Sequence, residues 1–149
     1  MTQREKYPFN IFVPNVLNIC IDNNDGEEVS GRLYHCYSVE PVIFENIVEM
    51  IQAAERLFDE ISFPQASTKT RSFQKTNDIY VKKTEKLMEQ SAMLNYQGEK
   101  ATFIVSVRFR QRSTWQGEFF SIKTMEKETF GSMVDFIKKI DKAMQEVDN

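Results

Sequence analysis

An internal repeat constrains the fold of this chain more than any other feature of its sequence. The 31 residues that begin at Gly31 align without a gap with those that begin at Gly117, at an offset of 86 positions, and six of the aligned positions are identical. Nine apolar positions coincide at the 3, 4 and 7 spacing of an amphipathic helix. The pattern predicts one helix in each copy. The core residues it predicts are Phe44, Ile51, Phe58, Phe130, Ile137 and Met144.

A β-hairpin is predicted before each helix. Asp25-Gly26 lies between two runs of strand-forming residues, and Asp-Gly is a strong signal for a two-residue turn. Arg112-Ser113 lies between two alternating runs in the second copy. Each copy therefore has the pattern of two strands and a helix. We predict an α+β protein of two layers, in which duplicated ββα units form one antiparallel sheet with both helices packed on one face.

The domain organisation follows from the length and the repeat. A chain of 149 residues has the size of one domain, so a single domain over residues 1–149 is expected. The repeat covers 15–61 and 101–147, and a connector over 62–100 joins the copies. The start of the connector is rich in Ser and Thr and lacks periodicity, and a helix is predicted over about residues 79–94. Such a connector is long enough to cover part of the open sheet face.

Strict alternation outward from the two turns assigns each strand residue to a face. Leu17 and Ile19 would share the helix-covered face with Tyr34 and Cys36. In the second copy, the residues assigned to that face are Phe103, Val105, Val107, Phe109, Phe120 and Ile122. The open face then mixes cations with apolar side chains, which is unusual for a solvated sheet surface. The residues assigned to the open face are Cys20, Leu33, His35, Tyr37, Arg108, Arg110, Trp115, Phe119 and Lys123.

The candidate binding surface is this open face. Arg108, Arg110 and Arg112 follow one another at the spacing of two that places side chains on one side of a strand. Beside Trp115 and Phe119 they resemble in kind the basic-aromatic sheets that stack single-stranded bases. Alternatively, the guanidinium groups lie on aromatic rings of their own fold or pair with the acidic first third of the chain. The predicted binding residues are Arg108, Arg110, Arg112, Trp115, Phe119, Tyr37 and His35.

The charge is unevenly distributed along the chain. The net charge of -3 argues mildly against a dedicated nucleic-acid binder. However, residues 1–61 carry 4 basic and 11 acidic side chains, whereas residues 62–112 carry 10 basic and 4 acidic ones. Residues 113–149 carry 5 and 7. The middle third is therefore a basic island, which either pairs with the acidic flanks as a solvated surface or attracts an anionic partner.

No catalytic constellation is visible. His35 is the only histidine, and it points away from its neighbour Cys36 on a strand. Cys20 is the remaining thiol partner for His35, but nothing in the sequence orients the imidazole as a base. One histidine and two cysteines do not suffice for a zinc site built from His and Cys alone. We predict no catalytic residues, no metal ligands and no cofactor.

The compartment follows from what the sequence lacks. No run approaches the roughly 18 apolar residues that a membrane span needs, and the N-terminal residues lack the apolar core of a signal peptide. The prediction is a cytoplasmic protein without membrane contact, with both cysteines reduced.

Three short segments resemble a known family. FPQAS at 63–67, RSF at 71–73 and RFRQRSTWQG at 108–117 are similar to segments of a family of small conserved bacterial proteins of unknown function. The resemblance extends over most of the chain. It implies a bacterial cytoplasmic protein, and it implies nothing about chemistry because the family offers no activity or site residues.

Two functions from different classes remain open. The first is a non-enzymatic interaction module, in one form a homodimer that closes its open sheet faces on each other. The second is a nucleic-acid or nucleotide binder that uses Arg108, Arg110 and Trp115. An enzyme has the least support, because no constellation of reactive groups is visible.

Overall fold

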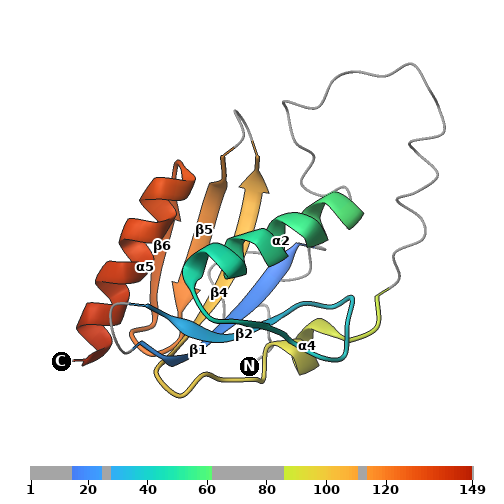
Figure 1. Cartoon of the computed structure of the whole chain (residues 1–149), viewed down its shortest axis with the longest axis horizontal. Helices are drawn as coiled ribbons and strands as arrows, with labels where there is room; N and C mark the ends of the chain where they lie inside the picture. The colour runs from blue at the N-terminus through green and yellow to red at the C-terminus, as the bar shows by residue number, and fades with distance from the viewer. Residues whose placement is uncertain (1–14, 25–27, 62–85, 111–113, 149) are drawn as a thin grey trace.

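The structure is a computed structural model that describes residues 15–24, 28–61, 86–110 and 114–148. It is an α+β fold with a six-stranded antiparallel sheet in the order β3-β2-β1-β4-β5-β6 (Figure 1), which confirms the predicted fold class. The strands are β1 (Val16–Asn23), β2 (Ser30–Tyr34), β3 (Val42–Phe44), β4 (Ala101–Phe109), β5 (Gln116–Ser121) and β6 (Glu126–Phe130). The helices in the described ranges are α2 (Ile47–Ile61), α4 (Gln90–Met93) and α5 (Met133–Asp148).

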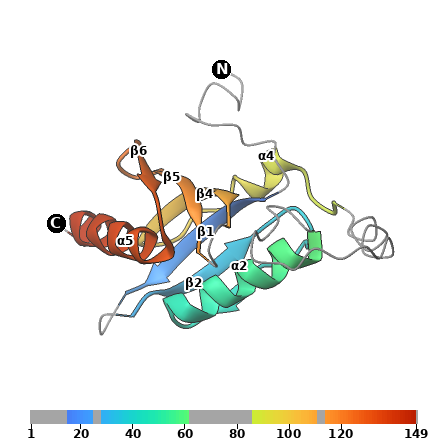
Figure 2. The ribbon, with the colours of Figure 1, turned by 90° about the horizontal axis from the view of Figure 1, so that it is seen from above.

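The two long helices cover one face of the sheet, as predicted. Figure 2 shows α2 and α5 on one side and the short α4 on the other. The main core lies between the sheet and the two long helices, and a smaller apolar cluster lies on the α4 side. Of the six predicted core residues, Ile137 is only partly buried, while the other five are buried. The phase of both helices was therefore predicted correctly.

The two halves of the sheet pair their strands in the same register. Gly31 opposes Phe44 in the first half, and Gly117 opposes Phe130 in the second. The second pair therefore lies 86 positions after the first at both of its residues, which is the offset of the repeat. If Gly31 carried a side chain, its Cβ would lie 1.9 Å from the carbonyl oxygen of Cys20. Every residue type other than glycine would therefore clash with β1 at this position. The shared glycine is therefore required by close strand approach. However, the predicted ββα unit is not confirmed, because each half has a third strand, β3 or β6.

The first turn of each long helix is stabilised in the same way. The side chain of Asn46 accepts a hydrogen bond from the backbone N–H of Glu49 at 2.9 Å, and the Glu49 carboxylate accepts one from the Glu45 N–H. In α5, Ser132 and Asp135 form the equivalent pair. These reciprocal bonds satisfy N–H groups that have no partner inside the helix.

A β-bulge at the same place in each half reverses the predicted faces. Pairing shifts between Ile21 and Asn23 in β1, and between Val107 and Phe109 in β4. The prediction from strict alternation is wrong beyond this point, because one extra residue turns every later side chain of the pairing to the other face. Within the two apolar clusters, the residues found opposite their predicted face are Leu33, Tyr34, Cys36, Trp115, Phe119, Phe120 and Ile122. Phe109, also predicted on the helix-covered face, is 54% exposed.

An ion pair joins the two strands at each bulge, and the acidic and basic residues exchange places between the two halves. Asp22, the extra residue of β1, pairs with Arg32 of β2 at 2.8 Å. At the equivalent positions, Arg108 of β4 pairs with the buried Glu118 of β5. The repeat therefore keeps the interaction between the two strands but exchanges acid for base.

Candidate functional site

Trp115 lies in the core and not on the open face. Its side chain is 0% exposed, and its ring lies beside those of Phe58 in α2 and Phe136 in α5, with centroids 5.7 and 5.6 Å away. The indole Nε1 donates a hydrogen bond to the carboxylate of Glu55. The prediction that Trp115 lies on the sheet face away from the helices is wrong. The ring instead fills the space between the two long helices.

Arg110 is also buried on the helix side, so its predicted placement on the open face is wrong. It is 4% exposed, and its Nη1 lies 2.9 Å from Glu55 and 3.0 Å from Asp59. Its guanidinium carbon lies 5.5 Å from the centre of the Phe58 ring. The structure thus agrees with the alternative in which an arginine pairs with the acidic first third and lies on an aromatic ring of its own fold.

The remaining predicted residues do not form one surface. Phe119 is buried on the helix side against Phe103 and Phe136, while Arg108 is exposed and paired with Glu118. Arg112 lies outside the described residues. His35 and Tyr37 belong to the segment after β2 and are half-buried.

His35 is half-buried and accepts a hydrogen bond from the backbone. The Tyr37 backbone N–H donates to its Nδ1 at 3.0 Å. Burial lowers the pKa of the imidazole below its ordinary value, so His35 is neutral near pH 7.

Residues 86–100 of the connector cover part of the open sheet face, which lies opposite the two long helices. Asn18 of β1 donates from Nδ2 to the carbonyl oxygens of Met93 and Tyr96, each at 2.9 Å. The rings of Tyr34 and Tyr96 stack with centroids 4.0 Å apart. The expectation that the connector covers part of this face agrees with these contacts. Of the helix predicted over about 79–94, the described part contains only α4, and 79–85 lie outside the described residues.

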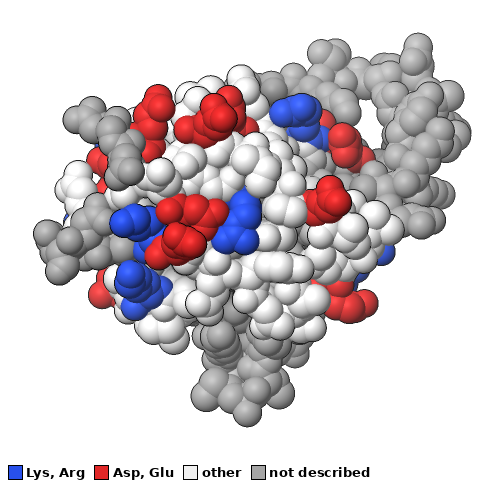
Figure 3. Space-filling view, turned by 60° about the horizontal axis from the view of Figure 1, so that its bottom comes forward, with Lys and Arg blue, Asp and Glu red and all other residues white. Residues whose placement is uncertain are grey.

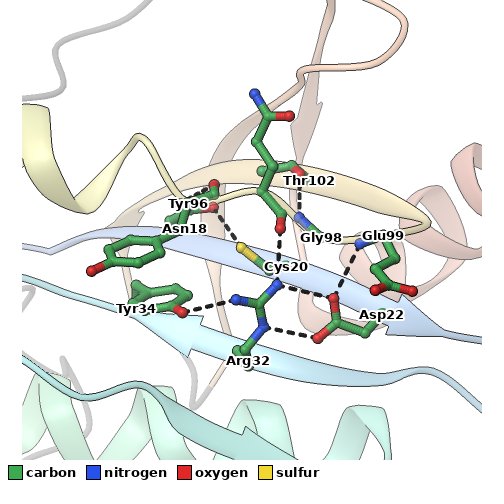
Figure 4. Close-up of polar contacts among 10 residues, drawn as sticks. Asn18, Cys20, Asp22, Arg32, Tyr34, Tyr96, Gly98, Glu99 and Thr102 are labelled. Carbon is green, nitrogen blue, oxygen red and sulfur yellow. Dashed lines mark hydrogen bonds and ion pairs between the residues drawn. The ribbon is translucent and has the colours of Figure 1, made fainter.

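A polar network fixes the end of this connector to the sheet (Figure 4). Arg32 donates to both carboxylate oxygens of Asp22, to the Tyr34 hydroxyl and to the Gln97 carbonyl, at 2.8 to 3.0 Å. The backbone N–H of Glu99 donates to the same carboxylate at 3.1 Å. The Arg32 guanidinium holds the pKa of Asp22 below its ordinary value. The four hydrogen bonds from Arg32 all go to groups of the fold itself, so the network acts as a structural clamp.

The thiols of Cys20 and Cys36 are not activated. Burial raises the pKa of the Cys20 thiol to about 12 and also raises that of Cys36. A thiol that stays protonated near neutral pH is a poor nucleophile and a poor metal ligand. In the described ranges, no three His, Cys, Asp or Glu side chains come together as a metal site would require.

A groove between α2 and α5 is the strongest candidate for a binding site. It has a volume of about 530 Å³ and lies between the first turn of α2 and the middle of α5. Val29, the residue before β2, also lines it. Its other lining residues are Glu28, Asn46, Ile47, Val48, Glu49, Ile137, Lys138, Ile140 and Asp141. The volume falls within the range of about 300–1,000 Å³ that is usual for small-molecule pockets.

Neither the face in Figure 3 nor the lining of the groove has a charge that favours a polyanion. In Figure 3, acidic and basic side chains are interspersed on the described part of the face, and no extended patch has a single sign. Around the groove, three carboxylates accompany one ammonium group, that of Lys138. The local charge is therefore negative, which disfavours nucleic acid and other anions.

Sequence reasoning missed this groove because its residues carry no chemical motif. One signal was available. Extended two residues upstream of Gly31 and Gly117, the repeat pairs Val29 with Trp115. The structure places Val29 at the groove and Trp115 between the helices, so a large ring in one copy corresponds to a small side chain in the other.

No protein-family model, curated protein or solved structure matches this chain. Among the described helices, none combines the length and the apolar character needed to cross a bilayer.

Proposed function

We propose that this protein is a binding module without catalytic chemistry, and that the groove between α2 and α5 is its binding site. The groove itself carries the proposal, since it is concave, has apolar walls from Val29, Ile47 and Ile140, and has the volume of a ligand pocket. A few polar groups at its edge are available to orient a ligand. The protonated thiols of Cys20 and Cys36 argue against catalysis by a cysteine nucleophile.

The two functions expected from the sequence have less support. Stacking of nucleic-acid bases needs exposed rings, whereas Trp115 and Phe119 are buried. Dimerisation through the open sheet face was inferred from apolar residues predicted there. Residues 86–100 occupy part of that face, and several of those apolar residues belong to the main core. The proposal therefore keeps the non-enzymatic class of the first expected function, but it replaces the protein partner at the open sheet face with a small ligand in the groove.

The repeat offers a matched pair of variants that tests this site. Val48 and Val134 occupy equivalent positions in α2 and α5 and are 58% and 61% exposed. Val48 lines the groove, and Val134 does not. We expect Val48→Asp to abolish the binding of small apolar fragments, detected by NMR shifts of the groove methyl groups. Val134→Asp should leave binding unchanged.

The pair also separates binding from stability. Both substitutions replace an exposed valine near the start of a helix, so their effects on the melting temperature should agree within a few degrees. Fragments that bind the wild type and both variants alike would contradict the assignment of the groove. So would the complete absence of binding across a fragment library at millimolar concentration.

A further inference from the structure

The space between the two long helices has two ends, and matching positions of the repeat line both of them. At the first end, the C-terminal half of α2 approaches the start of α5, and Trp115 lies between them. Its indole N–H donates to Glu55 of α2, and Arg110 pairs with the same carboxylate. This end therefore holds a planar aromatic ring whose N–H group is bound by a helix carboxylate.

At the second end, the repeat equivalents of Trp115 and Glu55 line the groove. Val29 stands where the first end has Trp115, and Asp141 of α5 stands where it has Glu55, each at the repeat offset of 86. Ile140 takes the place of Ala54 and makes the helix wall more apolar. The second end therefore keeps the carboxylate and the apolar walls, while the ring is replaced by a valine.

We propose that the groove binds a small planar aromatic molecule that carries an N–H donor, an indole-like ring being the simplest example. This inference rests on the proposed function and adds the chemical class of the ligand. The ring occupies the space beside Val29, and its N–H donates to the carboxylate of Asp141. The volume of about 530 Å³ leaves room for substituents on the ring.

The charges at the groove fit a donor ligand. Glu28, Glu49 and Asp141 line it together with the single cation Lys138. The first end places Arg110 against Glu55, whereas the position equivalent to Arg110 holds the uncharged Asn24. Gln145 donates to one oxygen of Asp141 over a long 3.4 Å. A neutral or cationic N–H donor complements this set, and an anionic ligand would be repelled.

The first experiment compares indole with benzofuran, which has a similar shape but carries an oxygen in place of the N–H. Both are titrated into the full chain labelled at Ile and Val methyl groups, and NMR shifts of Val29, Ile47 and Ile140 report binding. We expect indole to bind about 10-fold tighter or more, because a hydrogen bond to a charged acceptor is one of the stronger kinds. Equal affinities would overturn the inference about the N–H donor while leaving the groove as a binding site.

Two variants locate the interaction. Asp141→Asn should lower the affinity for indole toward that for benzofuran, since a neutral amide oxygen replaces the charged acceptor. Glu126→Gln removes an exposed carboxylate that does not line this groove, and it should leave both affinities unchanged. An unchanged preference for indole in Asp141→Asn would overturn the role of Asp141.

A third variant fills the groove from within. Val29→Trp places an indole at the position equivalent to Trp115, and it should abolish the binding of both rings. If neither ring binds the wild type even at millimolar concentration, the ligand class and the groove as an aromatic binding site both fail. Binding of both rings that persists in a folded Val29→Trp variant would show that they bind elsewhere and would overturn the proposal.

Discussion

The two halves of this protein share a backbone plan and differ in what a few matched side chains do. Both halves pair their strands in the same register, with a bulge at the same place and the same bonds at the helix start. In the second half, Trp115 closes the cleft between the helices, whereas in the first half Val29 lines an open groove. The comparison teaches that a few matched positions, Val29 and Trp115 first among them, distinguish a filled space between the helices from an open groove.

The largest difference is expected from truncation at the two ends of the cleft. Trp115→Ala should destabilise the fold by about 3–5 kcal/mol, because a fully buried ring is removed from between two helices. Val29→Ala should cost about 1 kcal/mol or less, because Val29 is half-buried. Urea unfolding followed by circular dichroism measures both. Similar losses at the two positions would break the comparison, since they would mean that the groove end is packed as tightly as the Trp115 end.

A smaller difference is expected at the two helix carboxylates. Glu55→Ala removes the acceptor of the Trp115 N–H and one of the two carboxylates around the buried Arg110, so a loss of about 1–3 kcal/mol is expected. Asp141→Ala changes an exposed position at the groove and should stay within about 0.5 kcal/mol of the wild type. Chemical denaturation of the two variants in parallel provides the test. A large loss at Asp141 would assign it a structural role.

The smallest expected effect is the pH dependence of the stability that the Asp22–Arg32 ion pair contributes. The pKa of Asp22 is lowered in the folded state by its bonds to Arg32, so this pair stabilises the fold above about pH 4, near the unfolded pKa of Asp. The contribution is lost as the pH falls through the lower folded value. It should be about 1 kcal/mol or less, since the pair is partly exposed.

Asp22→Asn measures this contribution directly. Its melting temperature should lie below that of the wild type at pH 7, and the gap should shrink as the pH is lowered from 4 to 2. A gap that stays constant over this interval would show that the carboxylate charge of Asp22 does not stabilise the fold. Glu126→Gln, at an exposed position of β6, is the control for loss of a carboxylate.

The helices could be predicted from sequence because their signal is local and repeated. Buried residues such as Phe58 and Met144 follow the helical period, and the same period recurs 86 residues away. The third strand of each half was missed. β3 has only three residues, and β6 lies at the sheet edge with four exposed residues before Phe130, so neither shows clean apolar alternation.

The faces of the sheet could not be predicted, because parity depends on a single extra residue. The pairing of Phe109 with Gln116 fits the predicted two-residue turn, but Val107 pairs with Gly117, one position out of step. Neither bulge residue, Asp22 or Arg108, is of a type that marks such a shift in the sequence. This one step moved Trp115 from a predicted surface into the core, and the predicted site was lost with it.

The exchanged charges at the two bulges have a consequence for how the strands choose their neighbours. The hairpins β1-β2 and β4-β5 have nearly the same shape and register, so backbone hydrogen bonds alone would allow β1 to pair with β5 of its own chain or of another copy. In the register of the repeat, that pairing would set Asp22 against Glu118, and the reciprocal pairing would set Arg108 against Arg32. Like charges across adjacent strands repel, most strongly at a buried position such as Glu118. The two ion pairs thus favour the pairing of each strand with its own hairpin partner. They disfavour strand exchange within a chain and between chains.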